Sequence, residues 1–274
     1  MAVLKRIRRV PVLPSVTCGC GAKTPQVTLL QSFPEGLNVA VVGASGGIGE
    51  ALVRHLDAAA NVATVQALTR SPGSGNGARV RRLPVDILDE DSIRRAAELA
   101  AADAPIDVLI VASGVLHLPG PVMPEKSLRE LDAEVMARIL AINTIGPAMV
   151  AKHFLPRMRP GRKSVFAVLS ARVGSISDNR LGGWYSYRAS KAALNMLLKT
   201  LAIEHARRFP ASIVVGLHPG TVATALSAPF QQRVPEGKLF TPDFAAERLL
   251  AVIDGLEVPD SGSVFAWDGS RIEC

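Results

Sequence analysis

Cysteine is scarce in this chain of 274 residues, which contains three, all near the two ends: Cys18, Cys20 and Cys274. Small domains that depend on disulfides carry more cysteines and space them through the chain. An internal disulfide framework is therefore excluded, and we expect a reducing compartment, the cytoplasm. No metal site is predicted, because Cys18 and Cys20 have too few potential partner ligands.

Long apolar runs are also absent. No uninterrupted stretch approaches the ~20 residues of a membrane-spanning helix, so no membrane association is expected. Hydrophobic residues make up 48% of the chain and charged residues 20%, a composition that excludes disorder as the overall state. The length suits one large α/β domain with a sizeable core.

Acidic residues are missing from the N-terminal end, where the first one is Glu35. The segment before it is basic and interrupted by prolines, and it carries most of the net charge of +7. The rest of the chain is nearly balanced, so no nucleic-acid partner is expected. We assign residues 1–34 to a loosely ordered extension and residues 35–274 to the functional domain. Either an organelle-targeting segment or an incidental extension would have this composition.

From Leu37 onward, short apolar runs alternate with segments of helical spacing. Strands that alternate with helices form a parallel sheet covered on both faces. We therefore predict an α/β fold, a single Rossmann-like doubly wound domain with a parallel seven-stranded sheet. The expected strands are 37–42, 62–69, 79–85, 106–112, 163–170, 212–218 and 263–266. The expected helices are 50–60, 91–102, 128–140, 143–157, 185–209 and 243–255, with Asp89 as a helix N-cap.

A glycine-rich segment, Val42-Gly43-Ala44-Ser45-Gly46-Gly47-Ile48-Gly49, lies between the first strand and the first helix. Glycines allow a sharp turn and a close approach of the backbone to a ligand. The helix that follows offers free N–H groups and the positive end of its dipole to a pyrophosphate. The spacing G-x-x-x-G-x-G differs from the broader G-x-G-x-x-G fingerprint, but its strand–turn–helix context fits. We predict that this turn binds a dinucleotide, through Gly43, Ser45, Gly46, Gly47, Ile48 and Gly49.

The end of the second expected strand distinguishes NAD from NADP. An acidic residue at this point binds a ribose 2′-hydroxyl, whereas this chain has Thr69-Arg70-Ser71. A guanidinium attracts a 2′-phosphate, which a carboxylate would repel. We therefore predict NADP, with Arg70 as a ligand. NAD stays open, because Arg70 is the one basic residue evident there, and a solvated loop charge is the alternative reading of it.

Two further segments fit the same predicted pocket. Asp86 and Ile87 follow the third strand, where the carboxylate could accept a hydrogen bond from an adenine amino group. Ala112, Ser113 and Gly114 follow the fourth strand, and their small size would let the backbone lie along a ribose. Ordinary turns at the ends of strands would account for both segments equally simply.

Tyr187 and Lys191 are four residues apart on an expected helix and therefore share a face. A phenol with an ordinary pKa near 10 is a poor base at neutral pH, and a nearby ammonium would lower that pKa. Such a pair exchanges a proton with an alcohol or a carbonyl while hydride moves to or from a nicotinamide. Because Y-x-x-x-K alone is common, the inference rests on its combination with the glycine-rich turn.

Together these motifs resemble the short-chain dehydrogenase/reductase family of the single-domain type, from residue 37 to the end of the chain. The glycine-rich turn, Ala112-Ser113-Gly114, Asn143, the Tyr187/Lys191 pair and Pro219-Gly220 occur in the order and spacing of that family. Residues 183–191 and 218–222 resemble its C-factor-like branch, which is named for an intercellular developmental signal of some bacteria.

The resemblance implies further roles. Asn143 would bend its helix locally and hold a water that links Lys191 to solvent. Pro219, Gly220, Val222 and Thr224 would hold the nicotinamide carboxamide, and residues 225–238 would cover a small-molecule carbonyl or alcohol substrate. Members of the family often pair through the helices that carry the asparagine and the tyrosine, so a homodimer or homotetramer is expected by analogy.

One expected residue is displaced. The family places a carbonyl-polarising serine three residues before a glycine at the end of the fifth strand, and counting back from Gly174 gives Ala171. Ser170 and Ser175 flank the position. We predict Ser170 as the polarising residue, with Ser175 as the alternative.

The leading functional hypothesis is an NADP-dependent carbonyl reductase or alcohol dehydrogenase with Tyr187 as acid/base and Lys191 as its partner. The alternative is a dinucleotide-binding signalling or regulatory protein with little or no catalysis, which the displaced serine favours. An isomerase or dehydratase on the same scaffold is a third hypothesis. The short segment after Pro219 leaves little room for the substrate domain that such enzymes often carry.

Overall fold

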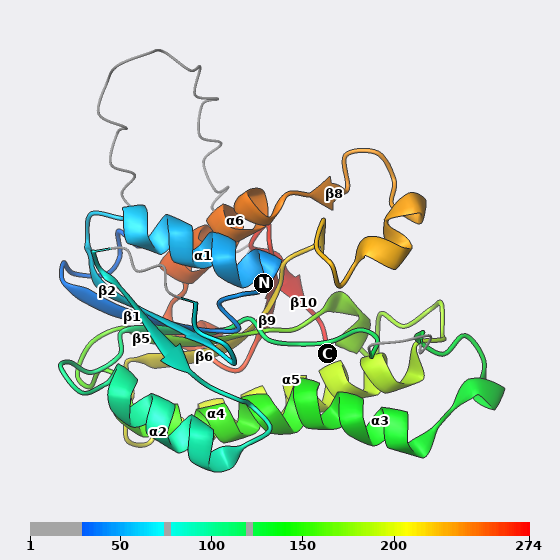
Figure 1. Cartoon of the computed structure of the whole chain (residues 1–274), viewed down its shortest axis with the longest axis horizontal. Coiled ribbons are helices and arrows are strands. Elements are labelled where there is room, and N and C mark those ends of the chain that lie inside the picture. Colours follow the sequence, from blue (N-terminus) through cyan, green and yellow to red (C-terminus); the bar gives the residue numbers. More distant parts are fainter. Residues whose placement is uncertain (1–28, 74–77, 119–122) are drawn as a thin grey trace, which may run out of the picture.

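A computed structural model describes residues 29–73, 78–118 and 123–274 of the chain. Within these residues, one sheet has the strand order β10-β9-β6-β5-β4-β1-β2-β3, and β7 and β8 form a small separate pair (Figure 1). The strands are β1 (Leu37–Val42), β2 (Val62–Thr69), β3 (Val80–Pro84), β4 (Val108–Val111), β5 (Ser164–Leu169), β6 (Ser212–His218), β7 (Thr221–Val222), β8 (Leu239–Phe240), β9 (Val264–Ala266) and β10 (Arg271–Ile272).

The large sheet is parallel except at one edge. Strands β1 to β6 and β9 pair in parallel, and these are the seven strands that the sequence predicts. The two-residue strand β10 adds an antiparallel partner to β9. The order changes direction between β1 and β4, which makes the sheet doubly wound, and ligands bind at such a switch point, outside the carboxyl ends of the strands.

Helices cover both faces of this sheet. Figure 1 shows α1 (Gly47–Ala58) and α6 (Pro242–Gly255) on one face. The other face carries α2 (Glu90–Ala100), α4 (Gly146–Phe154) and α5 (Tyr185–His205), with α3 (Ala133–Leu140) extending from α4. Strand β1 contacts both layers: Val39 and Val41 belong to one buried cluster, and Ala40 and Val42 to the other. A strand that is apolar on both faces is typical of a sheet buried between two layers.

The expected helix over 143–157 differs most from the observed structure. A π-helical turn, Ala141–Ile145, joins α3 to α4, so the backbone does deviate at the predicted Asn143. By length and composition alone, Ala133–Arg157 is long and apolar enough to cross a membrane. Asn143, Val150 and Phe154 within it are buried against the rest of the domain, as in a core helix of a globular protein.

The packed domain begins before residue 35, which corrects the predicted boundary. Leu30 and Phe33 are 1% and 5% exposed and belong to the cluster beneath α1 and α6. The carbonyl of Leu30 accepts a hydrogen bond from Asn61 Nδ2 at 3.0 Å. Lys163 Nζ lies 4.6 Å from the centre of the Phe33 ring. The predicted start at residue 35 is based on where acidic residues first appear in the sequence. The start of the packed domain depends instead on which apolar side chains reach the core.

Candidate active site

The glycine-rich turn connects β1 to α1 in a backbone shape that side chains would prevent. Gly43 has a φ of +86°, and a Cβ on it would lie 2.8 Å from the backbone nitrogen of Ser113. A Cβ on Gly49 would collide with the carbonyl oxygen of Gly43. The turn is therefore packed against both its own helix and the end of β4.

The groups around this turn fit a dinucleotide. Gly46 caps α1 without a side-chain hydrogen bond, so N–H groups of the first turn are available to a pyrophosphate. The Ser113 hydroxyl is buried and has no hydrogen-bond partner within the described residues, as expected for a group that binds a ligand hydroxyl. A Cβ on Gly47 would lie 2.8 Å from Thr224 Cγ2, which brings the predicted nicotinamide loop beside the turn. Ile48 lines the larger cavity described below.

A cavity of about 330 Å³ lies at the end of β2. Ser45, Thr69, Ser71 and Arg82 are among the residues that line it, and the Thr69 hydroxyl donates to Ser45 Oγ at 2.9 Å. Arg70 is exposed and is not among the residues that line this cavity, so its contact with a 2′-phosphate stays a prediction. Two arginines do line it, Arg54 from α1 and Arg82 from the neighbouring strand β3, and a sequence search restricted to the end of β2 finds neither.

The other predicted adenosine ligands occupy ordinary turn positions. Asp86 Oδ1 accepts from the backbone N–H of Leu88 at 2.9 Å, and Ile87 packs against Gly146. Neither residue lines the cavities at the turn or at Tyr187. Ala112 continues β4 toward the buried Ser113, so a ligand role is still geometrically open to this second segment.

Tyr187 lines a second cavity of about 640 Å³, and Lys191 lies behind it. Lys191 is 4% exposed, and its Nζ donates to the carbonyl of Leu169 at 2.8 Å. That nitrogen is 5.8 Å from the centre of the Tyr187 ring. The predicted pair is therefore assembled at one edge of the sheet, where the carboxyl end of β5 meets α5.

Burial dominates the ionisation of both groups. It raises the pKa of Tyr187 to about 12 and lowers the pKa of Lys191 to about 8. The expectation that the ammonium lowers the phenol pKa is therefore wrong for this arrangement. Desolvation of a phenolate outweighs an ammonium whose proton is directed at a carbonyl oxygen rather than at the phenol.

Asn143 connects the π-helical turn to the loop after β4. Its Oδ1 accepts from Val115 N and its Nδ2 donates to Val115 O, both at 2.8 Å. Nδ2 also donates to Ser190 Oγ at 3.1 Å. A Cβ on Gly114 would lie 3.3 Å from Asn143 Oδ1 and 3.6 Å from Lys191 Nζ. Asn143 therefore holds the predicted ribose segment beside the lysine.

The three residues considered for carbonyl polarisation differ in what they offer. Ser170 lines the cavity, but its hydroxyl donates to Asn195 Oδ1 at 2.6 Å. Ala171 also lines the cavity and has no polar side-chain atom. Ser175 does not line it, and its hydroxyl lies 3.3 Å from that of Ser177.

The predicted nicotinamide loop contributes to the same cavity, which Pro219, Gly220, Val222 and Thr224 all line. Trp184 and Phe230 line it as well, with ring centres 5.3 Å apart. His218, at the end of β6, is a lining residue that the sequence reasoning missed. Its position directly before Pro219-Gly220, at the carboxyl end of an apolar strand, was the available signal. Among the described residues, no cluster of three or more His, Cys, Asp or Glu could hold a metal ion.

Comparison with known proteins gives a consistent result. Residues 37–235 match a family model described as short chain dehydrogenase. The C-signal protein of Myxococcus xanthus is 36% identical over 168 residues, which cover 61% of this chain and 92% of that protein. The 1-hydroxy-2-glutathionyl-2-methyl-3-butene dehydrogenase of Rhodococcus sp. (strain AD45) is 32% identical over 237 residues, or 86% and 98% of the two chains.

Solved structures share the fold. The NADPH-bound carbonyl reductase from chicken fatty liver superposes with a TM-score of 0.76 at 24% identity, over 90% of this chain and 99% of that one. At this level of identity the likeness concerns the arrangement of the backbone, and the site must be argued from its own residues.

Proposed function

The chain belongs to the short-chain dehydrogenase family and is an oxidoreductase, and from that premise we propose that it reduces a small carbonyl compound to an alcohol with NADPH. The observation that carries the proposal is the position of Tyr187, which lines the larger cavity with Lys191 buried behind it. The same cavity adjoins the glycine-rich turn through Ile48 and Thr224. Substrate and nicotinamide sites would therefore share one space.

Tyr187 would act as the general acid. A pKa of about 12 keeps its hydroxyl protonated at neutral pH, which suits reduction rather than proton abstraction. In the reaction the Tyr187 O–H bond breaks, and its proton goes to the carbonyl oxygen to form the alcohol O–H bond. The bound nicotinamide supplies the hydride to the carbonyl carbon.

Lys191 and Asn143 would support this proton transfer without accepting the substrate proton themselves. A protonated Lys191 stabilises negative charge that develops on the phenol oxygen. Asn143 holds the loop after β4 through its paired hydrogen bonds to Val115. This fixes Gly114 against Lys191, so the lysine keeps one position relative to Tyr187.

NADPH is favoured over NADH by the cavity at the end of β2. Ser45, Ser71 and Arg82 line it, and their hydroxyl and guanidinium groups are donors that suit a phosphate. Glu50 also lines the cavity, but it lies 3.8 Å from Arg54 in an ion pair. We therefore assign the 2′-phosphate to this cavity and to Arg82 rather than to Arg70.

A signalling or regulatory role with little catalysis is the second candidate. Ala171 favours it, because this residue lines the cavity without the hydroxyl that the family resemblance leads one to expect. The intact Tyr187/Lys191 pair favours the enzyme. A regulatory dinucleotide-binding protein would bind NADPH and consume none with any carbonyl.

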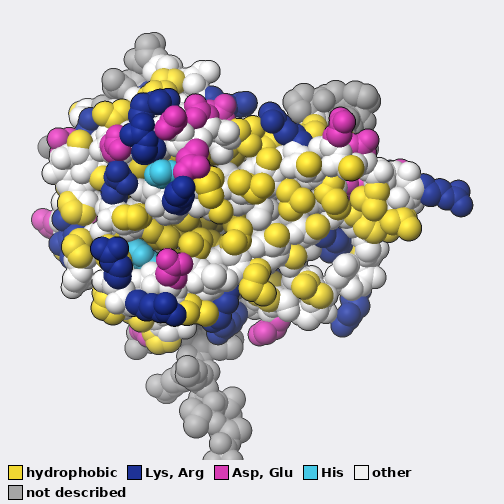
Figure 2. Space-filling view, turned by 90° about the horizontal axis from the view of Figure 1, so that it is seen from below, with side chains coloured by type: hydrophobic (Ala, Val, Ile, Leu, Met, Phe, Trp, Pro, Cys, Tyr) yellow, Lys and Arg dark blue, Asp and Glu magenta, His cyan; other side chains and the backbone are white. Residues whose placement is uncertain are grey.

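We further propose that the protein forms a homodimer or homotetramer through the helical face below the sheet. Figure 2 shows hydrophobic side chains gathered across this face of the molecule. Ile145, Met196 and Ile203, from the π-helical turn and α5, are each more than half exposed. Exposed apolar groups that are close together on one face are typical of an association surface.

The decisive experiment measures NADPH consumption with a diverse panel of aldehydes and ketones. Tyr187→Phe should lower turnover by ~10²–10⁴-fold, because the proton donor is lost, while NADPH still binds. Tyr185→Phe is the matched control: Tyr185 is on the same helix, is exposed, and lines neither cavity. Near-normal turnover by Tyr187→Phe, or no turnover by the unmodified protein, would contradict the proposed function.

A further inference from the structure

His218 occupies an unusual position at the carboxyl end of β6. Its Nδ1 is buried and has no hydrogen-bond partner within the described part of the chain. A buried polar atom without a partner costs free energy, so such atoms are rare and typically belong to sites that bind something. Here the side chain lines the cavity that also contains Tyr187.

The strand geometry directs this imidazole to the catalytic side of the sheet. Alternate residues of a strand point to the same face, so His218 shares a face with Gly216. A Cβ on Gly216 would lie 3.3 Å from Leu198 Cδ1 of α5 and 3.4 Å from Ser170 Cβ. His218 therefore points toward the helix layer that contains α5. It directly follows Leu217, which pairs with Leu169 of the neighbouring strand β5.

The three residues considered for carbonyl polarisation do not offer a free hydroxyl proton in this cavity. The Ser170 hydroxyl has one proton, which goes to Asn195. Ala171 has none to offer, and Ser175 lies outside the cavity lining. Burial, helped by the positive charge of Arg172, lowers the pKa of His218 to about 4. The imidazole is therefore neutral near pH 7, with one N–H donor and one acceptor nitrogen.

We propose that the ring N–H of His218 donates a hydrogen bond to the reacting oxygen of the carbonyl substrate and so takes the role for which the sequence offers Ser170 or Ser175. This inference rests on the proposed carbonyl reduction. The hydrogen bond strengthens as negative charge develops on the oxygen, while Tyr187 transfers its proton to that same atom. His218 is then a catalytic residue that transfers no proton of its own.

Single variants test the donor. His218→Phe keeps a planar ring without a donor and should lower kcat by ~10²–10³-fold, as the loss of one oxyanion donor does. His218→Gln retains an N–H donor and should stay within about tenfold of the unmodified enzyme. His153→Phe is the matched control. His153 lies on α4, contacts Glu90 of α2 and lines neither cavity. NADPH affinity should be unchanged in all three.

A second variant places a hydroxyl at the position where the resemblance expects one. Ala171→Ser, added to His218→Phe, should recover at least about tenfold in kcat, because Ala171 lines the same cavity. Recovery would distinguish a lost hydrogen-bond donor from a disturbed fold.

Histidine NMR provides a readout that does not depend on a stable variant. The resonance of the His218 ring is identified as the one that is missing from the spectrum of His218→Gln. Adding NADP⁺ and the alcohol product to the unmodified enzyme should shift this resonance. An unshifted resonance, or a His218→Phe enzyme within about threefold of normal kcat, would overturn the assignment of His218 and leave carbonyl reduction intact. An unmodified protein that reduces no carbonyl would overturn both.

Discussion

At the scale of single residues, the site is built from groups whose surroundings oppose their charged forms. Lys191 is 4% exposed and is paired with a carbonyl oxygen rather than a carboxylate. Tyr187 has an upward and Lys191 a downward pKa shift, both caused by burial. Such paired shifts in a cavity are typical of functional sites rather than of groups selected for stability.

Lys191→Met should stabilise the protein at pH 7 by about 1–2 kcal/mol while abolishing turnover. The pKa of Lys191 is about 8 in the folded protein, where the side chain is buried, and 10.5 where it is not, as in the unfolded chain. Below pH 8 both states are protonated, and the full cost of burying the charge is present. As the pH rises from 8 toward 10.5, the folded state releases its proton first, and the cost disappears.

The stability gain from Lys191→Met should therefore shrink between pH 7 and pH 10, which urea unfolding at several pH values would measure. Lys199→Met is the control, because Lys199 is exposed on the same helix. A Lys191→Met protein less stable than the unmodified one at pH 7 would show that the hydrogen bond to Leu169 outweighs the burial of charge.

Arg82→Gln should weaken NADPH binding by about 10- to 100-fold and leave NADH binding nearly unchanged. The variant removes the charge-assisted contact that we propose to the 2′-phosphate, and such a contact contributes about 1.5–3 kcal/mol. Fluorescence titration with both cofactors gives the comparison. Arg70→Gln serves as the control. An equal loss of NADPH affinity in the two variants would mean that the exposed Arg70 also binds the 2′-phosphate.

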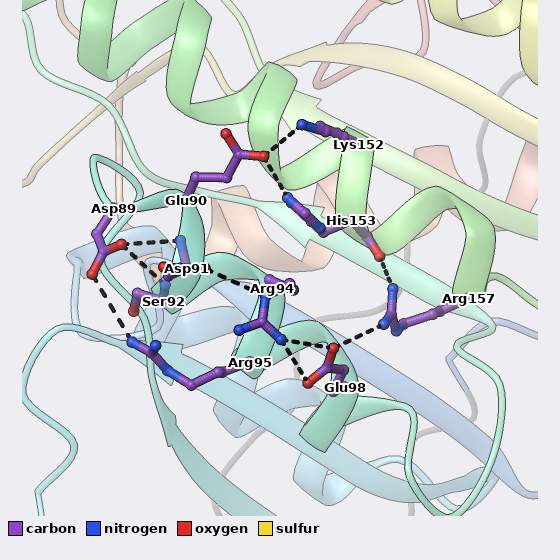
Figure 3. A network of polar contacts seen from close by, with 10 residues as sticks. All are labelled: Asp89, Glu90, Asp91, Ser92, Arg94, Arg95, Glu98, Lys152, His153 and Arg157. Carbon is purple, nitrogen blue, oxygen red and sulfur yellow. Dashed lines mark hydrogen bonds and ion pairs between the residues drawn. The ribbon is translucent and has the colours of Figure 1, made fainter.

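At the scale of elements, helix α2 shows which surface contacts contribute to stability. Asp89 Oδ1 accepts from the backbone N–H groups of Asp91 and Ser92 at the start of the helix. Figure 3 shows that Glu90 of α2 contacts Lys152 and His153 of α4, and that Glu98 contacts Arg94 within α2 and Arg157 in the 3-10 turn after α4. These ion pairs are largely solvent-exposed, so each is expected to contribute little.

Asp89→Ala should lower the free energy of unfolding by about 1 kcal/mol, because it leaves helix N–H groups unpaired. Glu98→Gln should change it by less than about 0.5 kcal/mol, although Glu98 has two arginine partners. Urea unfolding of both variants is the measurement. A larger effect of Glu98→Gln would mean that the network acts cooperatively.

The position of Tyr187 on helix α5 depends on how the N-terminal end of that helix is held. Trp184 precedes it in a left-handed conformation with a φ of +51°. Ser186 N donates to Glu125 Oε2 at 3.2 Å, and the Ser186 hydroxyl donates to the other carboxylate oxygen. A carboxylate at a helix N-terminus is favoured by the helix dipole. The loop before α3 therefore fixes the residue next to Tyr187.

At the scale of the whole molecule, the N-terminal segment belongs to the fold from Leu30 onward. The Ser32 hydroxyl donates to the carbonyl of Asp254 and accepts from Lys163 Nζ, both at 2.7 Å. The segment thus connects the end of α6 to the loop before β5, under the cluster that includes Leu30 and Phe33.

Deletion of residues 1–34 should lower the melting temperature by roughly 6–24 °C relative to deletion of residues 1–28. Losing the burial of Leu30 and Phe33 costs about 3–6 kcal/mol together, and a domain of this size loses about 2–4 °C per kcal/mol. Calorimetry on the two truncated proteins isolates the six residues. Equal melting temperatures would restore the boundary at residue 35.

The sequence alone determined the alternation of strands and helices, the glycine-rich turn and the Tyr187/Lys191 pair. Each of these depends on local spacing: an apolar run of strand length, three glycines before a helix, two side chains four residues apart. The N-cap Asp89 was found for the same reason, since its partners lie two and three residues along the chain.

Only the tertiary structure decided which groups from different elements meet. Arg82 lines the cavity at the end of β2 because β3 pairs beside β2, and His218 lines the cavity at Tyr187 because β6 pairs beside β5. The shifts at Tyr187 and Lys191 likewise follow from burial by the assembled layers, which no local spacing reveals. Leu30 and Phe33 joined the core for the same reason: desolvation and packing depend on neighbours that are distant in the sequence.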